Sequence, residues 1–270
     1  MNSVARNDRP PESLSHARDA LEFAERIAAL CSRVLGEIVA SLIVHGSLAL
    51  GDYTPRRSDI DLLGVVDRPP LDSEIELLTR AVAAERPDAP APVDLRFVTR
   101  AAAAAPSKAP SMELYARLDG SVPSEVESRH PGEPDLVVEF SICRAHGRAL
   151  LGAEPDAVIG EVPDEWVLLV GDAQLARWQS LTDDARHAAL MVLTACRVWR
   201  FSQERSHCSK AAAGSWALAR DPTLKAVRDA IRQRSGEAVR IDPTEIGRML
   251  SIVRTRIAAN QDAPTSADTG

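Results

Sequence analysis

Two acidic residues and a glycine–serine pair lie close together in the chain. Gly46 and Ser47 follow an apolar run at 38–44, and Asp59 and Asp61 open a second apolar run. Because side chains alternate across a β-strand, Asp59 and Asp61 point to the same face. Neighbouring carboxylates repel each other unless a cation lies between them, and Mg²⁺ often binds one or two carboxylates together with substrate phosphates. Gly46 also lets backbone N–H groups approach an anion, so these residues predict a metal site beside a phosphate-binding turn.

The glycine spacing also suggests a different phosphate-binding motif, the P-loop. Gly46 and Gly51 have the separation that this motif requires, but Asp52 and Tyr53 follow where it needs Lys and then Ser or Thr. The P-loop interpretation therefore fails. A structural alternative is that the segment is a turn whose two aspartates cap local backbone groups.

A third carboxylate is placed near this pair by the strand pattern. Short apolar runs with β-branched residues predict β-strands at 38–44, 60–66 and 93–98. In the third strand, Asp94 lies on the face opposite two apolar side chains. If this strand pairs with the second, Asp94 reaches Asp59 and Asp61. A strand aspartate also often serves as a structural cap.

Helical patterns fill most of the remaining chain. They cover residues 13–35, 72–86, 135–151, 164–180, 183–203, 209–220, 222–234 and 243–260. Residues 101–110 read as a surface connection, and 111–134 are not assigned. The sequence predicts an α/β domain at 12–155, with a small mixed sheet and flanking helices, then an all-helical domain at 156–260. Disordered tails are expected at 1–11 and 261–270.

Composition narrows the functional class. The chain has 270 residues, a net charge of −7 and four scattered cysteines without metal-site spacing. No apolar run reaches the roughly 18 residues of a membrane span, and no secretion signal is recognised, so we expect a cytoplasmic protein. An acidic chain suits a small cationic substrate better than a nucleic acid. The oligomeric state is left open, and a monomer is compatible with the sequence.

The motif and its spacing resemble the nucleotidyltransferase superfamily built on the palm of DNA polymerase β. The combination is Gly46-Ser47 after one strand and Ser58-Asp59-Ile60-Asp61 at the start of the next. The second half resembles the aminoglycoside adenylyltransferases, which modify streptomycin and spectinomycin. The residues that match this family are Arg144, His146, Ala149, Leu150, Gly152, Trp178, Asp183, Arg197, Trp199, Lys210 and Trp216.

The resemblance implies transfer of AMP from ATP to a hydroxyl of an antibiotic, with release of pyrophosphate. Such chemistry depends on positioning and charge neutralisation. In the family pattern, Asp59, Asp61 and Asp94 bind two Mg²⁺ ions, which hold the attacking and departing oxygens. Gly46 and Ser47 bind the triphosphate. Asp94 also matches the general base. The streptomycin and spectinomycin group has Glu there, so the shorter Asp94 either brings the substrate closer or serves mainly as a metal ligand.

Three residues of the second domain extend the implied site. Lys210 matches a lysine that reaches the triphosphate of ATP. Trp178 and Asp183 match residues that contact the drug through an aromatic face and a carboxylate. Each has an ordinary structural alternative: a solvent-facing lysine near a helix start, a core tryptophan and a helix-capping aspartate.

Two departures from the family bear on the substrate. Members that accept streptomycin carry a further acidic residue at the position of His187, and the family places a drug-contacting tryptophan in the region 111–134, which has none here. The sequence therefore favours spectinomycin over streptomycin. Other classes stay open: adenylylation of another metabolite, AMPylation of a protein, or a nucleotide-binding relative without turnover.

Overall fold

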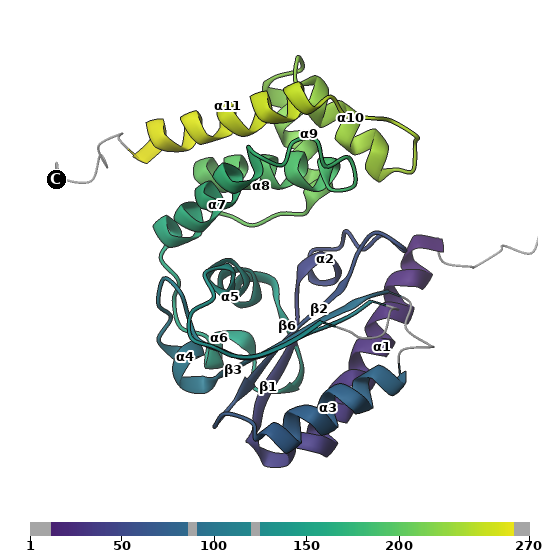
Figure 1. Cartoon of the computed structure of the whole chain (residues 1–270), viewed down its shortest axis with the longest axis vertical. Coiled ribbons are helices and arrows are strands. Elements are labelled where there is room, and N and C mark those ends of the chain that lie inside the picture. Colours follow the sequence, from purple (N-terminus) through teal and green to yellow (C-terminus); the bar gives the residue numbers. More distant parts are fainter. Residues whose placement is uncertain (1–11, 86–90, 120–124, 262–270) are drawn as a thin grey trace, which may run out of the picture. The chain divides into compact units, whose positions relative to one another are not determined.

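The structure, a computed structural model, describes residues 12–85, 91–119 and 125–261. The predicted tails lie outside these residues, except for Gln261, which ends the last helix. The chain divides into two compact units, which are described separately below (Figure 1). The sheet unit comprises Met1–Ala104, Ser111–Pro131 and His146–Ile159, and the helical unit Ala105–Pro110, Gly132–Ala145 and Gly160–Gly270. The domain limits 12–155 and 156–260 stay a prediction, since these units are discontinuous along the chain.

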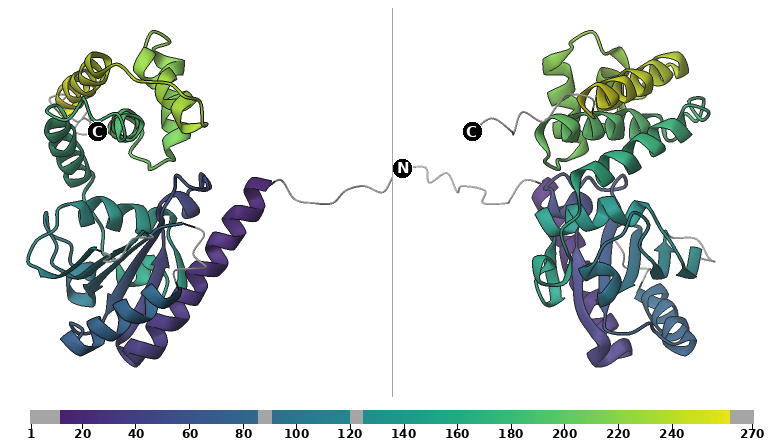
Figure 2. Two further views of the ribbon diagram at one scale, coloured as in Figure 1. Left: turned by 45° about the vertical axis from the view of Figure 1, so that its right-hand side comes forward. Right: turned by 90° about the vertical axis from the view of Figure 1, so that its left-hand side faces the viewer.

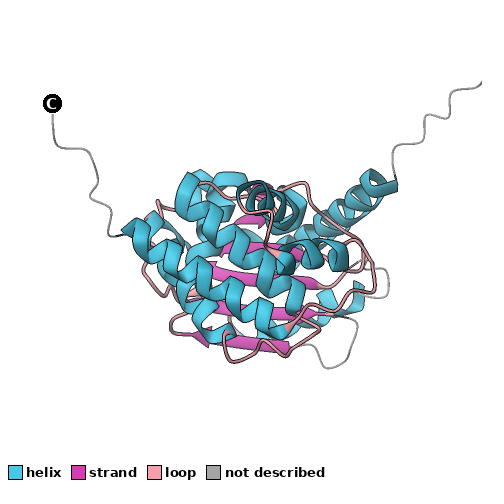
Figure 3. Ribbon diagram, turned by 90° about the horizontal axis from the view of Figure 1, so that it is seen from above, coloured by secondary structure: helices cyan, strands magenta, loops and turns pink. Residues whose placement is uncertain are grey.

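The sheet unit is built on a mixed sheet of six strands. The strands are β1 (Val39–Val44), β2 (Ile60–Val66), β3 (Val93–Thr99), β4 (Met112–Leu118), β5 (Glu125–His130) and β6 (Arg148–Gly152). Their order is β5-β4-β3-β2-β1-β6, with β2 and β3 parallel and the other neighbours antiparallel. Figure 3 shows the strands running side by side. The predicted mixed sheet with flanking helices is confirmed, and so are the three strands expected from the sequence.

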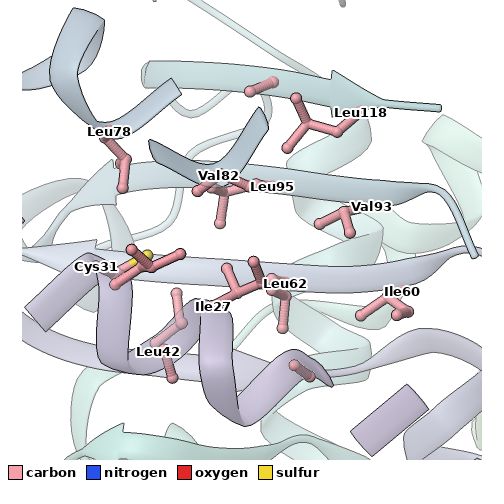
Figure 4. Packing of buried hydrophobic residues seen from close by; sticks show 14 of the residues in the cluster. Ile27, Cys31, Leu42, Ile60, Leu62, Leu78, Val82, Val93, Leu95 and Leu118 are labelled. Carbon is pink, nitrogen blue, oxygen red and sulfur yellow. The ribbon is translucent and has the colours of Figure 1, made fainter. Parts of the chain in front are cut away.

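Two helices bury their apolar stripes on one face of this sheet. They are α1 (Glu12–Leu35) and α3 (Asp72–Glu85), which lie on the same side of the strands (Figure 2). Figure 4 shows the packed side chains, which include Ile27, Cys31, Leu42, Leu62, Leu78, Val82 and Leu95. Fully burying each large apolar side chain contributes about 1.5–3 kcal/mol. This core fixes the orientation of β2 and β3, so their alternate side chains must face the other side.

Short elements complete the sheet unit. They are η1 (Gly36–Ile38), α2 (Gly46–Ala49), α4 (Arg100–Ala104) and α6 (Pro155–Val158). Helix α1 ends at Leu35, as predicted, and Gly36 follows with a φ of +61°, in the left-handed region typical of a helix end. The expected surface connection at 101–110 is wrong at its start, because α4 continues directly from β3 and buries Ala103.

The helix predicted at 135–151 is in fact two elements. Helix α5 (Asp135–His146) stops before Gly147, and the chain then forms β6, which pairs with β1. A strand of five residues is too short to show its own period, and only its non-local partner stabilises it. At Gly152, φ is +78° and a side chain would overlap the carbonyl oxygen of Ala40, so the edge of the sheet requires glycine here.

The helical unit gathers around one buried helix, α8 (Ala188–Glu204), which contacts each of the other four long helices. These are α7 (Asp164–Trp178), α9 (Lys210–Arg220), α10 (Lys225–Arg234) and α11 (Pro243–Gln261). All five were predicted, but α8 begins at Ala188 rather than at 183 because residues 181–187 form turns. Helix α5 joins this unit, where Val137 packs with α7 and with Phe201. In the described parts of the chain, no helix is long and apolar enough to cross a bilayer.

Candidate functional site

The glycine turn presses the chain directly against the start of β2. Gly46 follows β1 with a φ of +61°, and a Cβ there would overlap the Oδ2 atom of Asp61. The backbone N–H of His45 donates to the carbonyl oxygen of Asp61 at 3.1 Å, which fixes the turn in place. Only glycine allows both the left-handed backbone and this close approach. The turn and the Asp61 carboxylate are therefore held together by local geometry.

Ser47 has an unused polar atom in this turn. Its Oγ atom is buried and has no hydrogen-bond partner within the described protein. A buried hydroxyl without a partner is costly, so such atoms in native proteins usually meet a water, an ion or a ligand. An oxygen of a bound phosphate would satisfy the Ser47 hydroxyl. This supports the predicted role of the Gly46–Ser47 pair.

The three predicted aspartates lie on one face of two adjacent strands. Asp61 and Asp94 are direct partners in the parallel register of β2 and β3, and Asp59 precedes β2 by one residue. The predicted neighbourhood of the second and third strands is thus confirmed. The side chain of Asp59 is 34% exposed and that of Asp94 is 14% exposed. Both carboxylates remain accessible while the opposite side of each strand faces the core.

A guanidinium that the sequence did not identify bridges these carboxylates. Arg117 lies on β4, opposite Asp94 in the antiparallel register. Its Nη1 atom donates to both carboxylate oxygens of Asp94 at 2.8 Å and to Oδ2 of Asp59 at 3.3 Å. Its Nη2 atom lies 3.4 Å from Oδ1 of Asp59. The short contacts to Asp94 are in the range of charge-assisted hydrogen bonds, and those to Asp59 are longer and weaker.

Tyr115 is a second donor to Asp94 from the same strand. Its hydroxyl donates to Oδ1 of Asp94 at 3.2 Å, and the guanidinium of Arg96 lies 4.7 Å from the centre of its ring. Burial, followed by the negative charge of Asp94, raises the pKa of Tyr115 to about 12. The phenol is therefore neutral at physiological pH and remains a donor. Asp94 therefore accepts hydrogen bonds from both Arg117 and Tyr115.

Electrostatics keep Arg117 charged in this position. Burial alone would lower the pKa of its guanidinium, but Asp94 and Asp59 outweigh burial and raise the pKa. His45 directly precedes the glycine turn, and its pKa is lowered to about 3, mainly by burial and further by the positive charge of Arg96. His45 is therefore neutral, and the permanent positive charge of the cluster comes from arginine.

The donor set fits a hard divalent cation, although it is not assembled into a full ligand sphere. Among the described residues, no group of three or more His, Cys, Asp and Glu side chains is close enough to hold a metal. Arg117 instead lies at Asp59 and Asp94 as a cation of the protein itself. Mg²⁺ requires only one or two carboxylates when phosphate oxygens supply other ligands. The residues thus suit Mg²⁺ delivered together with a nucleotide.

The remaining predicted residues belong to the helical unit. Lys210 is half-buried at the first position of α9, behind Ser209, whose Oγ accepts from the N–H of Ala212 at 3.1 Å. Trp178 is the last residue of α7 and packs against the helical core. This packing agrees with its structural alternative without excluding an exposed edge for a ligand. The functional roles of both side chains stay predictions.

Asp183 is exposed in the turn before α8 and does not cap that helix. Its neighbour Asp184 accepts from the backbone N–H groups of Arg186 and His187 at 3.0 and 3.3 Å. The His187 ring lies 2.6 Å from the Asp184 carboxylate, and this hydrogen bond is the main cause of the lowered pKa of Asp184. Asp184 therefore takes the structural role, which leaves the Asp183 carboxylate available for a cationic ligand.

Arg117 and Tyr115 are the residues that sequence reasoning missed. They lie in the segment 111–134, which was left unassigned. A signal was present: residues 112–118 alternate apolar and polar side chains with a period of two, which is typical of a half-buried strand. The identity of the carboxylates opposite Arg117 depends on the pairing of β3 with β4, and no local pattern contains that information.

Comparisons with known proteins cover both units. A family model of the nucleotidyltransferase domain matches residues 25–150, and one of the aminoglycoside adenylyltransferase C-terminal domain matches residues 157–256. No curated protein sequence matches the chain. Among solved structures, the chain is similar to a spectinomycin adenyltransferase, AAD(9) from Enterococcus faecialis, crystallised with ATP and spectinomycin. That match has a TM-score of 0.70 and 16% identity, and covers 88% of this chain and 99% of the other.

At this identity the solved structure supports the fold, and the two family matches carry the assignment of the activity class. They follow one another along most of the chain, in the order that the sequence motifs predicted. The chain is a nucleotidyltransferase and belongs to the aminoglycoside adenylyltransferase family.

Proposed function

We propose that this protein transfers AMP from ATP to a hydroxyl of an aminocyclitol antibiotic, with spectinomycin favoured over streptomycin, and releases pyrophosphate. The observation that carries the proposal is the position of Asp59, Asp61 and Asp94 on one sheet face beside the unsatisfied hydroxyl of Ser47. This arrangement offers oxygen ligands next to a turn that accepts phosphate. The family membership makes an aminoglycoside-type acceptor the first choice.

The residues of the sheet unit have separate roles in binding the triphosphate and the metal. Gly46 and Ser47 bind the triphosphate, and Asp59, Asp61 and Asp94 hold Mg²⁺, in two sites if the family pattern applies. When bound, Mg²⁺ supplies charge neutralisation at the reacting phosphate. Asp94 either accepts the proton of the attacking hydroxyl or acts mainly as a ligand. As a base it first has to exchange the hydrogen bonds from Arg117 and Tyr115 for one to the substrate.

The helical unit supplies one further contact to ATP and two contacts to the drug. Lys210 binds the triphosphate, Trp178 offers an aromatic face and Asp183 pairs with an amine of the drug. His187 stands where streptomycin-accepting members carry an acid, and its ring is already bonded to Asp184. This leaves fewer carboxylates for streptomycin, which is the reason for favouring spectinomycin. The predicted cytoplasmic location belongs to the same proposal, and the oligomeric state is left open.

The decisive experiment is an adenylylation assay with purified protein. With ATP and Mg²⁺, spectinomycin should gain the mass of AMP and release pyrophosphate, and streptomycin should react more slowly. Expression should also protect bacteria on spectinomycin plates. Modification of neither drug, with ATP consumed on another acceptor, would redirect the proposal to that acceptor.

The role of Asp94 needs its own variant. Asp94→Asn should abolish transfer while ATP still binds, because the amide neither accepts the hydroxyl proton nor neutralises a cation. Turnover close to that of the wild type would exclude the base role. ATP binding measured by calorimetry on the same sample shows that the site is otherwise intact.

A further inference from the structure

Arg117 holds a position that the predicted mechanism does not explain. It projects from β4 to Asp94 on the adjacent strand β3 and to Asp59 just before β2, at the place where the mechanism requires a metal. Its side chain is only 30% exposed. An arginine does not lose its proton in a protein, so this charge is permanent. Any divalent cation that binds Asp59 and Asp94 must therefore compete with it.

A positive charge is needed at this position because the aspartates would otherwise repel one another. Asp59, Asp61 and Asp94 share one face of two adjacent strands. Partly buried like charges at this spacing destabilise a site unless a cation compensates them. Arg117 provides that cation from within the chain. The fold can therefore form before a metal or nucleotide is bound.

The two ends of the bridge differ in strength. Asp94 receives two contacts of 2.8 Å from Arg117 and a further hydrogen bond from Tyr115. From Arg117, Asp59 receives longer contacts of 3.3 and 3.4 Å, and it is the more exposed carboxylate. The Asp59 end is thus the one that a competing cation releases at the lower cost.

From this asymmetry we infer that Arg117 is a positioning residue that occupies the carboxylates before the nucleotide binds. It yields Asp59 to the metal–nucleotide complex before it yields Asp94. The inference rests on the proposed function. Its consequence is that a divalent ion alone binds weakly, because it must displace Arg117 without help from phosphate oxygens. Binding of metal is thereby coupled to binding of nucleotide.

The test measures binding of Mn²⁺ alone to the full chain, using the electron paramagnetic resonance signal of free Mn²⁺. Arg117→Gln should bind Mn²⁺ at least about tenfold more tightly than the wild type, since one opposite charge at this range is worth about one to three powers of ten. Arg117→Lys keeps the charge at Asp94 but has no fork to span to Asp59, so its affinity should lie between the two. Equal or weaker binding in both variants would overturn the inference.

Two further variants give the measurement its specificity. Arg100→Gln is the matched control, because Arg100 also pairs with an aspartate of this unit, Asp67, at 2.6 Å on the surface. It should leave the affinity for Mn²⁺ unchanged. Adding Asp59→Asn to Arg117→Gln should remove the gain, and a gain that survives would place the metal elsewhere and reject the inference. If Arg117→Gln fails to fold, the lysine variant decides alone.

The result is separable from the proposed function because no acceptor is present in the measurement. Tighter Mn²⁺ binding by the variants, without transfer to any aminocyclitol, would keep the role of Arg117 and reject the substrate. Transfer to spectinomycin, with unchanged Mn²⁺ affinity in the variants, would keep the substrate and reject the role of Arg117.

Discussion

An arginine–carboxylate–aromatic cluster in the sheet unit and another in the helical unit are built differently. The sheet cluster comprises Asp59, Asp94, Tyr115 and Arg117, and the helix cluster comprises Trp199, Glu204, Trp216 and Arg220. In the helix cluster the two indole rings meet edge to face at 4.8 Å, and the Trp216 N–H donates to Glu204. The guanidinium of Arg220 lies 3.7 Å from the centre of the Trp216 ring.

The difference lies in sequence distance and in charge balance. The hydrogen bonds of the helix cluster join residues 12 and 16 apart, whereas those of the sheet cluster join residues up to 58 apart. Glu204 is neutralised locally, since Arg200 lies one helical turn away at 2.7 Å. The sheet cluster instead collects several carboxylates that only strand pairing brings together. The comparison indicates that the helix cluster supports its fold and that the sheet cluster is arranged for a ligand.

The largest effect is expected in the sheet cluster, on activity rather than on stability. Asp59→Asn should lower turnover by about 10³-fold, because the proposed site would lose one of its carboxylate ligands for Mg²⁺. The free energy of unfolding should change by less than about 1 kcal/mol, since the Asp59 contacts are long and partly exposed. Radiolabelled AMP transfer and urea unfolding measure the two quantities. Asp67→Asn, which removes a surface pair with Arg100, is the control and should change neither. Loss of folding in Asp59→Asn would erase the distinction between the clusters.

The next effect concerns the turn that supports the sheet cluster. Gly46→Ala should destabilise the protein by about 2–4 kcal/mol, from its positive φ and from overlap with the Asp61 carboxylate. Gly51→Ala is a matched control, because Gly51 has a similar φ of +68° but nothing within 4 Å of an added Cβ. It should cost about 1 kcal/mol. Equal losses in urea unfolding would show that contact with Asp61 adds nothing.

The third prediction concerns stability, which should depend on pH in the sheet unit because of His45. Burial holds the pKa of His45 at about 3 in the folded protein, below its ordinary 6.5, so the unfolded chain binds the proton first as pH falls. The contribution of neutral His45 to the free energy of unfolding is therefore fully present above pH 6.5. It decreases as the pH falls, by about 2 kcal/mol on reaching about pH 5. The two tyrosines, Tyr53 and Tyr115, report on the sheet unit, and all four tryptophans lie in the helical unit. The tyrosine-detected transition should move with pH, and in His45→Gln this slope should flatten.

The carboxylates and the glycine turn of the candidate site were predictable because their signals are local. Asp59 and Asp61 are separated by one residue on a clear apolar strand, and the side of β3 that carries Asp94 follows from its alternation. Gly46 was recognised from its place at a strand end. These are statements about one segment at a time, and the structure confirms the strands on which they depend.

What the sequence did not reveal depends on pairing between distant segments. The pattern of β4 was readable, but nothing within 112–118 says that Arg117 faces Asp94 rather than solvent. The residues of β6 were predicted as the end of a helix, because a segment of five residues next to a helix is too short to show the alternation of a strand. The start of α8 was placed too early, since Asp183 resembles a helix cap, whereas residues 181–187 form turns in which Asp184 accepts from the N–H groups of Arg186 and His187. For β4 and β6 the missing information was the pairing with a distant strand, whereas for α8 it was a local turn.

The smallest effect is expected in the helix cluster, and it should appear in stability alone. Trp216→Phe removes the N–H that donates to Glu204 and part of the ring beneath Arg220, at a cost of about 1–2 kcal/mol. Fluorescence of the other three tryptophans would report this loss during urea unfolding. Affinity for Mn²⁺ should not change, because no carboxylate of the sheet cluster is touched. Glu204→Gln is the finer control: it keeps an oxygen acceptor for the indole N–H, so its midpoint should fall less than that of Trp216→Phe. A larger fall in Glu204→Gln would mean that charge rather than the hydrogen bond dominates here, and the helix cluster would then resemble the sheet cluster more closely than its geometry indicates.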